Sequence, residues 1–91
     1  MARSVPYCDL GEVMFLLARR KKGVSGPYNV ARHMSEELGR DVKGPSVSDY
    51  WRGTYWPPHQ FISDFAEVFE LSESERRRLA WAYAYGFRSA A

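Results

Sequence analysis

The sequence predicts an all-α domain of five helices, and three observations support this. Apolar residues recur at intervals of three and four in five separate segments, the spacing that lines one face of a helix. Proline, glycine or serine stands at most boundaries between these segments, where helices begin and end. No segment sustains the alternation of a strand. We treat residues 1–91 as a single domain, because a chain of this length can bury one modest core.

The first helix is expected to follow Asp9, a residue suited to the N-cap position. Its principal apolar side chains share one face: Leu10, Val13, Met14 and Leu17. The helix closes on the basic run of residues 19–22 and stops at Gly23, as helix C-termini favour. The basic run has two interpretations, a solvated helix end or a contact with phosphate, and the sequence leaves both open.

Two short helices follow, joined by the polar connector RDVKG. They are predicted at about 27–39 and about 45–52, and each begins near a proline and ends at a glycine. A helical wheel divides the second of them into an apolar and a polar side. The apolar side holds Val47, Tyr50 and Trp51. The polar side holds Pro45, Ser48, Asp49 and Arg52, with Ser46 at its edge.

The last two helices complete the domain. A fourth helix is expected from about Pro58, with an apolar stripe that includes Phe61, Phe65 and Phe69. A fifth is predicted at about 73–88, because Ser72 and Glu75 form a capping-box pattern at its start. Its inner face would carry Leu79, Tyr83 and Phe87.

Composition and motifs exclude several classes of function. The chain has a net charge of only +2 and a single cysteine, and it lacks catalytic pairings, glycine-rich phosphate loops and metal-ligand spacings. We therefore expect no enzymatic activity, cofactor, metal site or small-molecule ligand. No apolar stretch is long enough to span a membrane, and the N-terminus lacks the apolar core of a signal peptide. These features predict a cytoplasmic protein.

Two short helices joined by a connector within a small all-α bundle are typical of a helix-turn-helix. One side of the second helix would anchor in the core through Val47, Tyr50 and Trp51. Its other side would enter the major groove of double-stranded DNA. Short hydroxyl side chains there let the backbone approach closely, and Arg52 can bond a guanine or a phosphate.

Four segments in order carry a family resemblance: LGEVMFLLARRKKG, VARHM, SVSDYWRG and PPHQFISDFAEVFELSESERRRL. They resemble the helix-turn-helix family of phage repressor and Cro, the XRE family, over residues 10–80. Val47, Ser48, Arg52 and Gly53 match the family's recognition-helix pattern, and Ala31 matches its small residue in the preceding helix. The resemblance implies a five-helix repressor-like bundle and a dimeric, repressor-like transcription regulator from a bacterium or phage.

The chain departs from the family pattern at three places. Trp51 stands where a glutamate is usual. Gly26 and Pro27 replace the usual Ser-Gln, so the phosphate contact at that helix start falls to Tyr28, to Asn29 or to neither. The turn between the two short helices is about six residues longer than is usual, with the extra chain in SEELGRDVKG.

Two surfaces are predicted from these patterns. The DNA-binding residues are expected to be Asn29, Lys43, Ser46, Ser48, Asp49, Arg52, Thr54 and Tyr55. Trp56 has two interpretations, a phosphate contact or a cap on the core beside the fourth helix. A homodimer contact is expected at Trp81, Tyr85 and Arg88, on the outer face of the last helix. The alternative is that the first helix covers both faces of the last one.

A second function remains open at the level of sequence. The same fold could serve as a protein-interaction module, such as an antitoxin, an anti-repressor or a partner of RNA polymerase. The low net charge, the many aromatic residues and the acidic Asp49 beside a single arginine favour this alternative.

Overall fold

The computed structural model describes the main chain of residues 7–90 and the side chains of residues 7–86. Within this range the chain is all-α, as predicted, and contains no strand. Its helices are α1 (Asp9–Lys22), α2 (Pro27–Leu38), α3 (Gly44–Arg52), α4 (His59–Val68) and α5 (Glu73–Ala90). Among residues 7–90, no helix has both the length and the apolar character that crossing a bilayer requires.

The helix boundaries agree with the predicted ones to within two residues, with one correction at a cap. Asp9 is the first residue of α1, and Cys8 is the N-cap, without a capping bond from its side chain. The predicted capping box at the start of α5 is confirmed. The Ser72 N–H donates to Glu75 Oε1 at 2.7 Å, and the Glu75 N–H donates to Ser72 Oγ at 3.2 Å.

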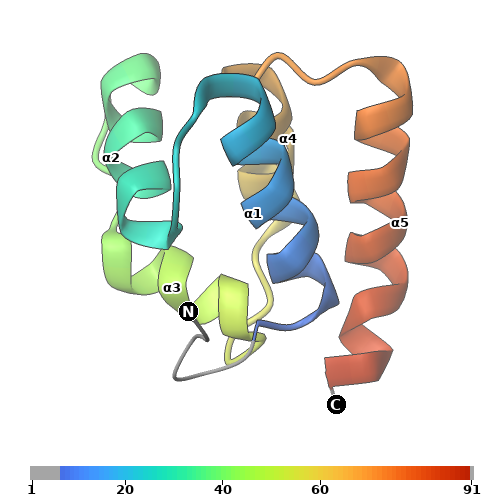
Figure 1. Ribbon diagram of the computed structural model, residues 1–91. Coiled ribbons are helices and arrows are strands. Elements are labelled where there is room, and N and C mark those ends of the chain that lie inside the picture. The colour runs from blue at the N-terminus through green and yellow to red at the C-terminus, as the bar shows by residue number, and fades with distance from the viewer. Residues whose placement is uncertain (1–6, 91) are drawn as a thin grey trace.

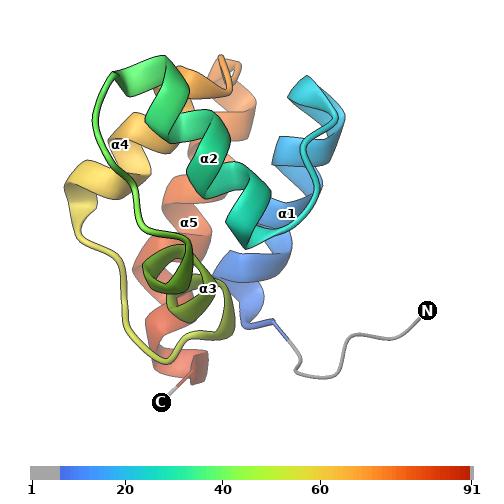
Figure 2. The same ribbon diagram turned by 90° about the vertical axis from the view of Figure 1, so that its left-hand side faces the viewer.

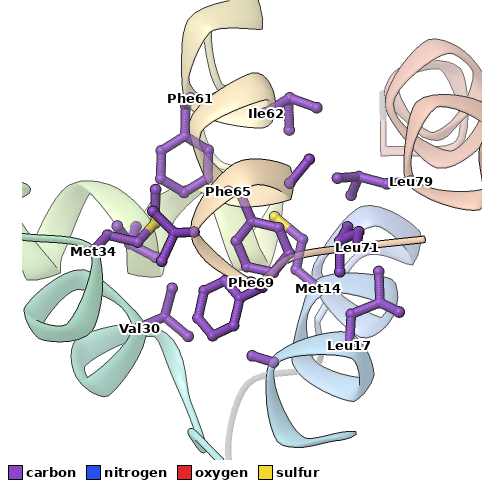
Figure 3. Packing of buried hydrophobic residues seen from close by; sticks show 14 of the residues in the cluster. Met14, Leu17, Val30, Met34, Phe61, Ile62, Phe65, Phe69, Leu71 and Leu79 are labelled. Carbon is purple, nitrogen blue, oxygen red and sulfur yellow. The ribbon is translucent and has the colours of Figure 1, made fainter. Parts of the chain in front are cut away.

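The core is centred on the aromatic stripe of α4 (Figure 3). Phe65 and Phe69 are fully buried, and their ring centroids lie 4.6 Å apart. Apolar side chains of the other helices surround them in Figure 3, among them Met14, Leu17, Val30, Met34 and Leu79. Side chains of α1, α2 and α5 therefore meet on this stripe at the centre of the core.

Helix α3 lies across one end of the bundle, below α1 and α2 in Figure 1. Its last turn is in contact with the main chain of α1. The Cys8 N–H donates to the Trp51 carbonyl oxygen at 3.0 Å. A Cβ at Gly11 would lie only 2.0 Å from that oxygen, so glycine is required where the two helices touch. This contact fixes the position of α3 relative to α1.

The long turn between α2 and α3 is closed at its base. Residues 39–43 run back beside α2 to the start of α3, as Figure 2 shows. Ser35 Oγ accepts a hydrogen bond from the Val42 N–H at 2.8 Å, and its own proton is directed to the Ala31 carbonyl oxygen at 2.8 Å. The turn is long, but its residue Val42 is hydrogen-bonded to Ser35 of α2, so the turn stays attached to that helix.

Candidate nucleic-acid interface

The predicted anchor of α3 is present. Val47 and Trp51 have no exposed surface. Tyr50 is half-buried at the flank, where its ring meets the ring of Phe61 edge-on at a centroid distance of 4.9 Å. The opposite side of α3 faces outward, with Pro45 and Arg52 exposed and Ser46 and Asp49 half-buried. A two-turn helix is thus held by its apolar side, and its polar side is accessible.

The prediction that Ser48 lies on this accessible side was wrong. Its residue surface is only 7% exposed. Val47 and Trp51 set the buried direction of α3, and at 100° per residue Ser48 lies only about 60° from Trp51 around the helix. The prediction had counted Tyr50 among the buried residues. This rotated the predicted boundary between the buried and accessible sides of α3, so that Ser48 was assigned to the accessible side. Ser48 is therefore removed from the candidate contact residues.

Both basic side chains at α3 are held by neighbouring carboxylates. Arg52 Nη2 donates to Asp49 Oδ1 at 2.8 Å, three residues earlier on the same helix. Lys43 forms an ion pair with Asp41, and the hydrogen bond to that carboxylate raises the pKa of Lys43 above its ordinary value. The accessible side of α3 is therefore polar and nearly neutral in charge.

The N-termini of α2 and α3 lie beside each other. A Cβ at Gly44 would lie 2.4 Å from the ring of Tyr28, so the first turns of the two helices are in contact at this point. Neither N-cap residue, Gly26 or Lys43, supplies a side-chain cap within the described part of the chain. The first N–H groups of a helix have no partner inside the helix, and the helix dipole makes this end positive. The N–H groups left for a ligand exclude those positions held by Pro27 and Pro45, whose nitrogens carry no hydrogen.

Asn29, a predicted contact at the start of α2, already makes bonds within that helix and the loop before it. Its Nδ2 donates to the Ser25 carbonyl oxygen at 2.8 Å, and its Oδ1 accepts from Arg32 at 2.8 Å. Tyr28, by contrast, is exposed beside the first turn of α3. Tyr28 and Asn29 were open alternatives for the phosphate contact at this helix start, and the structure brings Tyr28 against the first turn of α3.

The loop after α3 divides into an exposed part and a packed part. Thr54 and Tyr55 are exposed, Tyr55 by 66% of its surface, on the α3 side of the molecule. Trp56 stacks on Tyr83 of α5, with ring centroids 5.8 Å apart and an interplanar angle of 16°. The core-capping interpretation of Trp56 is therefore confirmed, and the ring on which it stacks belongs to α5.

The basic run at the end of α1 lies far from α3, at the opposite end of the bundle (Figure 1). Lys22 Nζ lies 3.0 Å from Glu70 Oε2, and Lys21 Nζ lies 3.0 Å from Glu75 Oε1. These lysines lower the pKa of both carboxyl groups; for Glu75 the main cause is the hydrogen bond from the Ser72 N–H. The run thus pairs with the α4–α5 end of the fold and does not extend the surface at α3.

A second candidate surface lies on α5. Trp81 is 66% exposed and Tyr85 is 48% exposed, with ring centroids 4.3 Å apart. The two rings border a groove of about 510 Å³ between α1 and α5, with Val13 on its α1 side. The alternative that α1 covers both faces of α5 is therefore wrong. Leu79 is buried and Tyr83 is half-buried on the inner face. The side chains of Phe87 and Arg88 lie outside the described residues.

No cluster of three or more metal-ligating side chains occurs within the described part of the chain. No protein-family model matches the sequence, and no match exists among the curated proteins or the solved structures.

Proposed function

We propose that the protein is a cytoplasmic, sequence-specific regulator that binds double-stranded DNA, in the manner of the phage-repressor family it resembles. In this proposal α2, the connector of residues 39–43 and α3 act as a helix-turn-helix, and α3 enters the major groove. The observation that carries the proposal is the division of α3 into two sides. Val47 and Trp51 are completely buried, and Ser46, Asp49 and Arg52 remain accessible.

The paired helix N-termini support the same orientation. Phosphate oxygens bind readily at helix N-termini, where main-chain N–H groups and the helix dipole act together. Residues 27–29 and 44–46 bring two such ends to one place beside α3. Contacts of this kind position a protein on the duplex and leave base recognition to the side chains of the groove-facing helix.

The accessible side chains suit recognition of bases more than general attraction to DNA. Asp49 can accept a hydrogen bond from cytosine, Ser46 can bond to any base, and Arg52 can bond guanine or phosphate. Because Lys43 and Arg52 are paired with carboxylates, they add little net attraction for an arbitrary duplex. We therefore expect weak binding to random DNA and much tighter binding to a selected sequence.

A homodimer through α5 is part of the proposal. Exposed aromatic rings are enriched in the contact surfaces between protein chains, and Trp81 with Tyr85 forms such a pair. A two-fold dimer would present two α3 helices to half-sites roughly 34 Å apart on a pseudo-palindrome.

Selection of bound sequences from random DNA, followed by titration of the selected and random duplexes, tests this function. Arg52→Ala should weaken binding to the selected duplex by about 1–3 kcal/mol. Arg20→Ala is the matched control, because Arg20 also faces a carboxylate, Glu75, but stands in the last turn of α1. This end of α1 is far from α3 (Figure 1). Equal affinity of the wild-type protein for every duplex would refute a sequence-specific regulator.

The second candidate function is a protein-interaction module on the same fold. One observation favours it: both basic side chains at α3, Lys43 and Arg52, are neutralised by carboxylates of the chain itself. A surface that binds another protein needs no excess positive charge. Absence of DNA binding even at low salt, where phosphate attraction is strongest, would favour this second function.

A further inference from the structure

One carboxylate of the fold is buried and has no part in the proposed DNA contacts. Asp64 of α4 is 8% exposed, and it is the one charged residue that is buried among residues 7–86. Its Oδ2 is paired with Arg40 of the connector, and its Oδ1 accepts a hydrogen bond from Gln60 at 2.9 Å. A buried carboxylate is costly unless it is paired and hydrogen-bonded, so this arrangement needs an explanation.

The connector has few other fixed points. On one side, Val42 is bonded to Ser35 of α2. On the other side, a hollow of about 250 Å³ with both polar and apolar walls lies between the connector, α3 and α4, so side chains do not fill this space. Arg40 reaches Asp64 at the border of this hollow. Besides the packing of Val42 on the core, the connector is therefore held by two polar ties, one to α2 and one to α4.

We propose that Asp64 is a positioning residue for recognition: through Arg40 it fixes the connector and thereby sets where the first turn of α3 presents Lys43 and Ser46. This inference rests on the proposed DNA-binding function. Lys43 is the N-cap of α3 and follows Arg40 by only three residues. Glycines stand at both ends of this segment, Gly39 and Gly44, so its main chain has little stiffness of its own. Loss of the tie to α4 would leave the segment held by Val42 alone.

Two variants remove the tie with opposite changes in charge. Arg40→Ala removes a positive charge, and Asp64→Asn removes a negative one while leaving an oxygen for Gln60. If Asp64 acts by positioning, both variants should lower the ratio of affinities for selected and random DNA, by about 3- to 30-fold. Arg40→Lys keeps the charge and should restore part of this ratio. Arg20→Ala, which disturbs a different arginine–carboxylate pair, should leave the ratio unchanged.

A direct electrostatic role for Arg40 gives a different pattern. Affinity for all duplexes would then fall in Arg40→Ala and rise or stay constant in Asp64→Asn, with the ratio unchanged in both. That result would overturn the proposal. So would unchanged ratios and unchanged affinities in both variants.

Hydrogen exchange in the free protein separates this inference from the proposed function. The amides of Val42 and of α3's first turn should exchange faster in Arg40→Ala and Asp64→Asn, while those in the second half of α4 keep the wild-type rate. Unchanged exchange at Val42 would overturn the positioning role whether or not DNA binds. Faster exchange together with no DNA binding by the wild type would support the tie and refute the proposed function.

Discussion

Gly11 of α1 lies directly against the main chain of Trp51 of α3. A Cβ at Gly11 would lie 2.0 Å from the carbonyl oxygen and 2.8 Å from the carbonyl carbon of Trp51. The obstacle is main chain, which cannot rotate away as a side chain can. The position of α3 relative to α1 therefore depends on the absence of a side chain at Gly11.

The substitution Gly11→Ala should consequently destabilise the protein strongly. Forcing a methyl group into this contact must separate α1 from α3, and we expect a loss of about 3 kcal/mol in the free energy of unfolding. Urea denaturation followed by far-UV circular dichroism measures this loss. Gly44→Ala is the matched control: its Cβ would meet only the exposed ring of Tyr28, which can move, so the loss should stay below about 1 kcal/mol. Equal losses in the two variants would contradict this account.

Stability at acid pH should depend on Glu75. The Ser72 N–H and Lys21 lower the pKa of Glu75 in the folded protein below its ordinary value of 4.5. Its contribution to stability is therefore fully present above pH 4.5 and is lost as the pH falls through the lower, folded pKa. Thermal unfolding from pH 6 to pH 2 should show a smaller acid-side loss in Glu75→Gln than in the wild type. Glu73→Gln, which affects a surface pair with Arg77, is the control. The same acid-side loss in Glu75→Gln and wild type would argue against this role.

Asp49 should restrain the affinity of α3 for DNA in general. Replacing it with alanine removes a negative charge from the accessible side of α3 and releases Arg52 from its 2.8 Å hydrogen bond. We expect Asp49→Ala to bind random DNA about 3- to 10-fold more tightly, with a salt dependence steeper by about one counterion. Ser48→Ala should change affinity less than about twofold, because Ser48 is buried away from a contacting duplex. Weaker binding of random DNA by Asp49→Ala would show that this reasoning is incorrect.

Trp81 and Tyr85 should control self-association without being needed for folding. Both rings are exposed at the groove between α1 and α5, so Trp81→Ala should leave the unfolding temperature within a few degrees of the wild type. Sedimentation equilibrium should show the dissociation constant of the dimer rising by about tenfold or more. Tyr55→Ala, which removes another exposed aromatic ring, from the loop after α3 and outside the groove between α1 and α5, should not change it. A wild-type protein that stays monomeric at high concentration would exclude the dimer.

Local patterns predicted most of the fold. Apolar spacing together with glycine and proline located every helix of residues 7–90 to within two residues. The Ser72–Glu75 capping box could be predicted from sequence because it spans a single helical turn. The buried direction of α3 was harder. Val47 and Trp51 determine it, and the amphipathic Tyr50 belongs to its flank, so the exposure of Ser48 was misjudged.

Pairings between distant residues could not be predicted in this way. Arg40 and Asp64 are separated by 24 residues, and Lys22 and Glu70 by 48. In sequence, each is an ordinary polar residue at a turn or a helix surface. Only the packing of α4 against α2 and α1 brings the partners together. The pairing of the basic run with the α4–α5 end of the fold was for this reason absent from the sequence-based expectation.

The three tryptophans occupy three distinct environments: Trp51 is enclosed with its Nε1 unpartnered in the described structure, Trp56 is stacked on Tyr83, and Trp81 is largely solvated. Indole emission shifts to longer wavelength with hydration. Trp51 therefore reports on the packing of α3, and Trp81 reports on the exposure of α5. Detachment of α3 would shift the blue component of the spectrum toward the red, and coverage of α5 by another chain would shift the red component toward the blue. Intrinsic fluorescence can therefore distinguish loosening of the recognition helix from assembly without any added dye.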